Sequence, residues 1–210
     1  MCGNGIRCIG AYLIRKLGKS EVDVLTRDGI KHISCAGSEY TVQMGKVRIN
    51  RQSAREYLTD KGDDSDTLLD LRVQIGSRAT RGSLVNAGVP HIVFMIDDAA
   101  VEDVKRIGEA INQDRARFPK GMNVDFAQIL GPHEISIRTY ERGVYDETMA
   151  CGTGATASAA AATLQGLVKP GSVKVTTRGG IINIKIDKEL NAQMTGPVAA
   201  VYSGELTTDI

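Results

Sequence analysis

Apolar residues at the start of the chain recur with the spacing of a helix. Residues 2–17 run from a Gly-rich turn into a periodic segment that Gly18 ends, so a first helix is expected there. One side of this helix carries Ile6, Ile9, Leu13, Ile14 and Leu17. A second helix, rich in alanine, is expected over residues 152–167, ending near Pro170-Gly171.

Most of the remaining chain consists of short β-type runs separated by turn signals such as Asp28-Gly29. The expected strands are 21–26, 30–35, 40–44, 67–75, 83–86, 91–96, 122–128, 134–140, 173–177, 181–186 and 198–202. A helix over 101–112 begins beside Asp97-Asp98, which would cap it, and the acidic stretch 60–66 is expected to be a solvated loop. This pattern predicts a mixed, mostly antiparallel α+β fold with few helices.

Composition narrows the classes of function. The 210 residues are 42% apolar and 24% charged with a net charge of +1, which is ordinary for a globular protein and favours neither nucleic acid nor a membrane as partner. The longest nearly apolar run, 157–162, is too short to span a bilayer, and the chain opens without a signal-peptide pattern, so a cytoplasmic protein is expected. Four cysteines, three histidines and no zinc-like spacing argue against a disulfide scaffold or a metal centre.

The two principal helices begin with the same motif. Residues 2–5 and residues 151–154 both read Cys-Gly-polar-Gly, and several short strands follow each helix. The echo suggests two related halves that face each other, each with a cysteine at a helix N-terminus. Four residues alone are weak evidence for a repeat.

A cysteine at a helix N-terminus lies at the positive end of the helix dipole, which can lower a thiol pKa from about 8.5 to roughly 3.5–7.5. Adjacent glycines let backbone N–H groups approach an anion such as a carboxylate. Two such helix ends would hold a carboxylate between them, with one thiol on each side of the neighbouring carbon. That arrangement suits a two-base racemisation, in which one thiolate removes the α-proton and the other thiol returns a proton. No cofactor is required, and the sequence has no cofactor fingerprint.

Simpler interpretations compete with this one. A single Cys-Gly pair before a helix is more often a plain turn with a small buried thiol. Cys8 within the first helix and Cys35 in a strand-like run are expected to be small core residues. His91 after Pro90 is, taken alone, typical of a histidine in a turn. The Glu141-Arg142 dipeptide is, taken alone, typical of a surface ion pair.

Two segments of the chain resemble the signatures of the diaminopimelate epimerase family. The first is residues 2–8, Cys-Gly-Asn-Gly-Ile-Arg-Cys, and the second runs from Tyr-Glu-Arg-Gly-Val at 140–144 to Ala-Cys-Gly-Thr-Gly-Ala at 150–155. Three further segments, 88–91, 118–119 and 123–126, resemble family segments in the same order. The similarity covers essentially the whole chain.

The resemblance implies roles for individual residues. Cys2 and Cys151 would be the two acid/base thiols. Four residues at the helix N-termini would hold the reacting carboxylate through backbone amides: Gly3, Asn4, Gly152 and Thr153. Three others would bind the substrate's amino and carboxylate groups, including those of its distal centre: Asn123, Glu141 and Arg142. His91 and Glu141 would tune the protonation of the thiols.

The resemblance also implies the architecture and the reaction. The expected fold is two pseudo-symmetric α+β domains, each a curved mixed or antiparallel sheet around a central helix, with the active site in the cleft between them. Residues 1–47 plus 197–210 would belong to the first domain and 48–196 to the second. The expected reaction interconverts LL- and meso-diaminopimelate for lysine and peptidoglycan-precursor synthesis, without cofactor or metal. The partner is the small-molecule substrate, and a homodimer is compatible with the resemblance.

Two departures from the family pattern qualify these expectations. Val89 stands where asparagine is usual, so a substrate contact would be lost or supplied by another residue such as Asn86. The segment that precedes Met1 in family members is missing here, so the first domain is expected to be incomplete and this polypeptide to have little or no activity. A related racemase of another amino acid, such as histidine, and an inactive fragment remain the alternatives.

Overall fold

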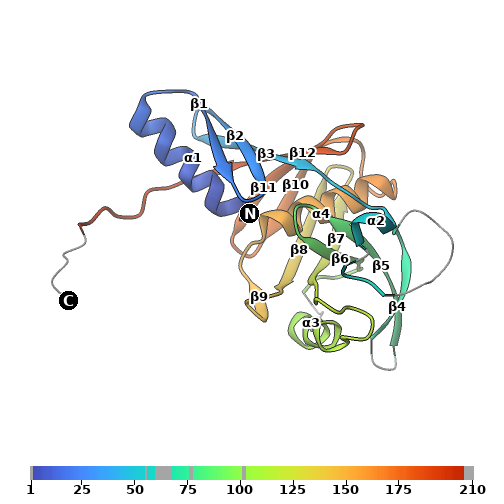
Figure 1. Ribbon diagram of the computed structural model, residues 1–210. Coiled ribbons are helices and arrows are strands. Elements are labelled where there is room, and N and C mark those ends of the chain that lie inside the picture. The colour runs from blue at the N-terminus through green and yellow to red at the C-terminus, as the bar shows by residue number, and fades with distance from the viewer. Residues whose placement is uncertain (1, 55, 60–67, 76–77, 101–102, 206–210) are drawn as a thin grey trace.

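The structure is a computed structural model that describes residues 2–54, 56–59, 68–75, 78–100 and 103–205 (Figure 1). Its helices are α1 (Gly3–Leu17), α2 (Arg51–Ala54), α3 (Val104–Gln113) and α4 (Gly152–Leu164). Its strands are β1 (Glu21–Thr26), β2 (Gly29–Ala36), β3 (Glu39–Lys46), β4 (Leu71–Ile75), β5 (Arg78–Asn86), β6 (Pro90–Met95), β7 (Asn123–Gly131), β8 (Glu134–Glu141), β9 (Asp146–Thr148), β10 (Gly171–Thr177), β11 (Gly180–Ile186) and β12 (Asn191–Pro197).

The strands form one continuous curved sheet in the order β1-β2-β3-β12-β11-β10-β8-β7-β6-β5-β4, and β9 pairs with β8. Neighbouring strands run antiparallel except for the β6–β7 and β8–β10 pairs, which are parallel. The mixed, mostly antiparallel α+β fold expected from the sequence is therefore confirmed. None of the helices in the described residues has the length and apolar character needed to cross a membrane.

Helix α4 lies at the centre of the curved sheet (Figure 1). Every residue from Gly152 to Ala162 is buried, and strands β5–β8 and β10–β12 all contact the helix. Alanine side chains are small enough for strands to approach from several directions, and a helix that is apolar all round belongs in a core. The Ala-rich sequence thus fixes α4 as the central element that carries Cys151 at its N-terminus.

Helix α1 packs on β1, β2 and β3 through a face that differs from the expected one. Ile6 and Ile14 are buried, but Ile9 and Leu17 are 49% and 55% exposed. Gly10 lies on the buried face instead, where an added Cβ would come within 2.5 Å of Ile33. The helix approaches β2 through its smallest residues, so counting only large apolar side chains placed the buried face wrongly.

Several expected boundaries are corrected. Residues 198–202 form no strand; the strand lies earlier, at β12, where Ala192, Met194 and Gly196 alternate as the buried positions. Helix α3 begins at Val104 and is capped by Asp103 rather than by Asp97-Asp98. Residues 60–67 and 101–102, where the acidic loop, the start of one strand and the start of this helix were expected, lie outside the described residues. Helix α2 and strand β9 were not expected.

The sheet crosses the predicted domain boundary. Strand β12 pairs with β11 on one side and with β3 on the other, so residues assigned to the second domain join the strands around α1. The division into residues 1–47 plus 197–210 and 48–196 stays a prediction.

Candidate active site

The two Cys-Gly-polar-Gly motifs form matching helix N-termini. Cys2 is the N-cap of α1, and its Sγ accepts a hydrogen bond from the Gly5 amide at 3.4 Å. Cys151 is the N-cap of α4, and its Sγ accepts from the Gly154 amide, also at 3.4 Å. Each sulfur therefore sits in the first turn of a helix, as the sequence predicted, among amides that lack intrahelical acceptors.

Glycine brings these two helix ends into contact. A Cβ added to Gly152 would lie 3.3 Å from the Gly3 Cα and 2.9 Å from the Met194 Sδ. The Asn4 side chain spans the junction and donates from Nδ2 to the Ala150 carbonyl at 3.3 Å. The N-termini of α1 and α4 thus meet at one place (Figure 1), and four of the predicted carboxylate-binding residues lie there: Gly3, Asn4, Gly152 and Thr153.

The two thiols differ in environment. Cys2 is exposed, whereas Cys151 is only 7% exposed. Burial, followed by the nearby carboxylates of Asp125 and Glu141, raises the pKa of Cys151 to about 12. The expected lowering of the pKa by the helix N-terminus is therefore wrong for Cys151 in the free protein, because desolvation and negative charge outweigh the hydrogen bonds from Thr153 and Gly154.

Of the other two cysteines, only Cys35 packs against the hydrophobic core. Cys8 is exposed because it lies on the outer side of α1, and the expectation that it packs in the core is wrong. Cys35 is half-buried, and its thiol donates to the Gly37 carbonyl at 3.5 Å.

His91 lies at the centre of a buried polar network behind Cys151. Its Nδ1 is 2.7 Å from Asp125 Oδ2 and its Nε2 is 3.0 Å from Thr153 Oγ1. Thr153 Oγ1 is in turn 3.3 Å from Cys151 Sγ. The imidazole and the Asp125 carboxylate are both fully buried. His91 is thus linked to Cys151 through one hydroxyl, close to the place that the resemblance implied.

Asp125 was not among the predicted site residues. Its Oδ1 accepts a hydrogen bond from Thr139 Oγ1 at 2.7 Å, and it packs so closely on Gly154 that an added Cβ there would collide with Oδ1. A sequence signal existed: Asn123 and Asp125 are polar residues two apart among the apolar residues at the start of β7, so both face the same side of the strand.

Three predicted substrate-binding residues lie side by side at the ends of β7 and β8. Asn123 Oδ1 accepts from the Arg142 backbone amide at 2.8 Å, and its Nδ2 lies 3.4 Å from His91 Nε2. Glu141 accepts a hydrogen bond from Thr148 Oγ1 at 2.6 Å. The guanidinium of Arg142 lies 5.6 Å from the centre of the Tyr57 ring.

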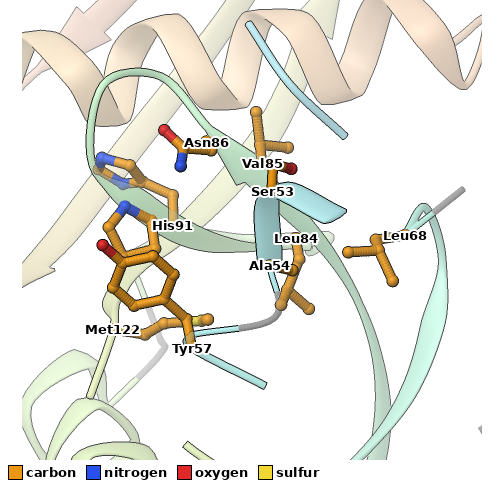
Figure 2. A pocket seen from close by; sticks show the side chains of 10 residues that line it. Ser53, Ala54, Tyr57, Leu68, Leu84, Val85, Asn86, His91 and Met122 are labelled. Atoms are coloured by element: carbon orange, nitrogen blue, oxygen red, sulfur yellow. The ribbon is translucent and has the colours of Figure 1, made fainter. Parts of the chain in front are cut away.

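A small cavity adjoins His91 (Figure 2), and its wall includes Tyr57, Asn86 and Met122. Beyond it, a larger hollow of about 560 Å³ is also lined by Tyr57 and Asn86. Asn86, proposed above to compensate for Val89, therefore faces both spaces, although its Oδ1 already accepts from the Gly88 amide at 3.0 Å. Within the described residues, no group of three or more His, Cys, Asp or Glu side chains is arranged to hold a metal ion.

Comparison with known proteins places this geometry in a family. The diaminopimelate epimerase family matches residues 83–201. The diaminopimelate epimerase of Methanocella arvoryzae is 36% identical over 213 residues, a match that covers 100% of this chain and 72% of the relative. The chain belongs to the diaminopimelate epimerase family. A second relative, the diaminopimelate epimerase of Aquifex aeolicus, is 34% identical over 100% of this chain and 71% of its own length.

Solved structures share the fold at lower identity. A predicted epimerase from Pseudomonas aeruginosa matches 97% of this chain and 73% of its own with a TM-score of 0.61 and 18% identity. A probable proline racemase from Agrobacterium radiobacter K84 covers 100% and 68% with a TM-score of 0.68 and 16% identity. The curved sheet around a central helix is therefore a fold that this diaminopimelate epimerase family member shares with both of these proteins.

Proposed function

We propose that the chain is a cofactor-independent isomerase that interconverts LL- and meso-diaminopimelate. The observation that carries the proposal is the junction of α1 and α4, where two helices begin against each other and each is capped by a cysteine. Membership of the diaminopimelate epimerase family supports the identity of the substrate.

The junction would bind the carboxylate at the reacting centre. The first amides of a helix have no intrahelical acceptor and carry the positive end of the dipole. The amides of Gly3 and Asn4 on α1 and of Gly152 and Thr153 on α4 would donate to the carboxylate oxygens. The same donors would stabilise the extra negative charge that develops on these oxygens when the α-proton leaves.

Cys2 and Cys151 would exchange protons with the two faces of the α-carbon. In one direction the Cys2 thiolate removes the proton, and the Cys151 thiol donates its own to the opposite face. In the reverse direction the two sulfurs swap roles. The high pKa of Cys151 suits the donor role in the free protein, since its sulfur then carries a proton at neutral pH.

The distal end of the substrate would extend towards Asn123, Glu141 and Arg142. Glu141 offers a carboxylate for an ammonium group, and the planar guanidinium of Arg142 can bond both oxygens of a carboxylate. We also propose a cytoplasmic location, the two-domain division given above, and roles for His91 and Glu141 in setting thiol protonation.

Deuterium exchange at the substrate α-carbon tests the proposal. The chain is incubated with LL-diaminopimelate in deuterium oxide, and both label uptake and the meso product are followed by NMR and chromatography. The chain from Met1 is expected to show little or no exchange. In a version extended by the N-terminal segment of family members, label and meso product are expected to accumulate together, and Cys2→Ala or Cys151→Ala in that version should abolish epimerisation because each thiol serves one face. Cys8→Ala is the matched control, because it removes an exposed thiol from the same helix as Cys2.

Parallel incubations with proline and histidine test the alternative racemases. Exchange with either of these substrates but not with diaminopimelate would replace the proposed substrate. Epimerisation that persists in either single alanine variant would refute the two-base assignment. No exchange with any of these substrates would favour the inactive-fragment alternative.

A further inference from the structure

The hydrogen bonds around His91 fix which of its nitrogens carries the proton. Asp125 Oδ2 lies 2.7 Å from Nδ1, and a carboxylate can only accept, so Nδ1 carries hydrogen and donates. Asn123 gives independent evidence at the other nitrogen. Its Oδ1 is occupied by the Arg142 amide, so the group facing Nε2 at 3.4 Å is its NH₂, which can only donate. Nε2 is therefore an acceptor.

This assignment gives the network a direction. Thr153 Oγ1, 3.0 Å from the accepting Nε2, must donate to it, which leaves the oxygen lone pairs free to accept from the Cys151 thiol at 3.3 Å. Cys151, Thr153, His91 and Asp125 then form a single chain of donors that ends on a carboxylate. Thr139 completes it by donating to Asp125 Oδ1 at 2.7 Å.

We propose that Asp125 and the hydroxyl of Thr153 are positioning residues that join the Cys151 thiol to His91 in one proton relay. The inference rests on the proposed function, since it explains how Cys151 serves as a base. In the relay, Cys151 passes its proton to Thr153 Oγ1, and Thr153 passes its own hydroxyl proton to His91 Nε2. The products are a thiolate and an imidazolium, the net charge of the buried group is unchanged, and the threonine is regenerated.

The surroundings of Cys151 show why such a path is needed. The residue is only 7% exposed, so a direct exchange of its proton with bulk water is hindered. Burial and two carboxylates raise the thiol pKa, which makes an isolated thiolate costly. An imidazolium held against Asp125 would place a compensating positive charge one hydroxyl away from the sulfur.

The charged and titratable groups near the sulfur come from several elements: His91 on β6, Asp125 on β7, Glu141 on β8 and Cys2 at the start of α1. Among them, Asp125 has two opposed effects on Cys151. As a nearby negative charge it disfavours the thiolate. As the partner of His91 it favours the proton's transfer to the imidazole. The relay requires the second effect to be the larger.

Replacing Asp125 by asparagine distinguishes the two effects, because their loss would change the ionisation of Cys151 in opposite directions. The oxygen next to Thr139 stays an acceptor, so the new NH₂ faces His91 Nδ1 and forces the opposite tautomer, with hydrogen on Nε2. Thr153 can then no longer donate to His91. The relay predicts a higher midpoint pH for Cys151 ionisation and a thiolate fraction at neutral pH at least about tenfold lower, equivalent to one pKa unit.

The experiment measures the pH dependence of Cys151 alkylation by iodoacetamide, quantified by mass spectrometry on the peptide that contains Cys151. The midpoint pH does not depend on how accessible the buried sulfur is. Cys2, Cys8 and Cys35 react in the same sample and serve as internal controls. Asp23→Asn is the matched control variant, because Asp23 Oδ1 lies 2.9 Å from Nδ1 of the exposed His32 and so forms another Asp–His pair.

Two further variants test the hydroxyl. Thr153→Val keeps the shape and the backbone amide but removes the relay, and should slow Cys151 alkylation about tenfold at neutral pH. Thr153→Ser retains the hydroxyl and should stay within about threefold of the parent, equivalent to half a pKa unit. Nitrogen-15 spectra of His91 give a second readout, since of these two Thr153 variants only Thr153→Val should shift the Nε2 resonance together with the Cys151 midpoint.

Faster alkylation in Asp125→Asn would overturn the relay, since Asp125 would then act only as a repelling charge. Equal midpoints in the two Thr153 variants would also overturn it. If Asp125→Asn fails to fold, the Thr153 pair and the His91 spectra decide. These measurements need no turnover, so the relay and the proposed epimerase activity can fail separately.

Discussion

Glu147 illustrates how a single side chain stabilises the rim of the candidate site. It faces Arg138 in a two-pronged ion pair, with Nε and Nη2 donating to its two carboxylate oxygens at 2.8 and 2.7 Å. The two side chains are only 11% and 21% exposed. The hydrogen bond from Arg138 lowers the pKa of Glu147 below its usual 4.5. The pair therefore joins β8 to β9 next to Glu141.

We predict that Glu147→Gln lowers the free energy of unfolding by about 1–3 kcal/mol near neutral pH, because a charge-assisted bond is lost in a partly buried place. Since the folded-state pKa is lowered, this stabilisation is present above about pH 4.5 and is lost as pH falls through the folded-state value. Urea unfolding at several pH values measures it.

The control for this prediction is Glu134→Gln, which removes an exposed pair with Lys174 and should cost at most about 1 kcal/mol. A stability difference between parent and Glu147→Gln that stayed constant down to about pH 3 would contradict the ionic origin, since both carboxyl states would then contribute equally.

Residue-level prediction from sequence succeeded where a local motif specified position and failed where partners came from distant strands. The Cys-Gly-polar-Gly motifs placed Cys2 and Cys151 at helix N-termini because capping depends on neighbouring residues. The pKa of Cys151 depends instead on burial and on Asp125, which is 26 positions earlier in the sequence. The residues next to the cysteine therefore could not show whether its pKa is raised or lowered. Only the fold sets that environment.

At the scale of elements, glycines set distances between helices and strands that the apolar periodicity of the sequence does not predict. Helix α3 packs on β8 at Gly108, where an added Cβ would come within 2.6 Å of the Tyr140 Cβ and closer to its ring. Tyr140 is 1% exposed and cannot move aside without disturbing the core. Gly108 therefore sets the distance between this helix and the strand that leads to Glu141.

Gly108→Ala is expected to destabilise the protein by about 1–3 kcal/mol through overpacking, although alanine favours a helix by about 1 kcal/mol over glycine. Thermal unfolding measures the change. Gly131→Ala is the matched control, since an added Cβ there meets nothing within 4 Å. A Gly108→Ala variant as stable as the parent would mean that α3 can shift outward at no cost.

Most elements were predictable because their apolar periods are clear, and two of the errors share one cause. Strand β12 and the buried face of α1 both pack through small residues, such as Gly196 and Gly10, which carry no hydrophobic signal of their own. The apolar stretch 198–202 attracted the strand prediction, yet its Val201 and Tyr202 are each 89% exposed. Large apolar residues indicate burial only when the fold supplies a neighbouring surface.

At the scale of the whole molecule, one sheet connects two helices of very different burial. Helix α4 is enclosed, whereas α1 covers three strands at one end of the sheet and exposes Ile9, Tyr12 and Leu17 on its outer side (Figure 1). Strand β12 is the link, since it pairs with β3 next to α1 and with β11 next to α4. The candidate site thus joins an enclosed helix that carries Cys151 to a more exposed helix that carries Cys2.

This contrast predicts different hydrogen-exchange rates for the two helices. Amides of Gly152–Leu164 should open only with global unfolding, because every residue from Gly152 to Ala162 is buried and surrounded by strands. Amides of Gly3–Leu17 should exchange faster, because α1 packs on the strands through one face only and its Ile9, Tyr12 and Leu17 are already exposed, so local opening of α1 uncovers less apolar surface than opening of α4. Mass spectrometry of peptides from the two helices measures both rates in one sample. If a carboxylate ligand binds at the junction of the helix N-termini, it should slow exchange in the first turn of α1 more than in α4, since α4 is already protected. Equal protection of the two helices in the free protein would show instead that the sheet unfolds as a single cooperative unit and that Cys2 is held as firmly as Cys151.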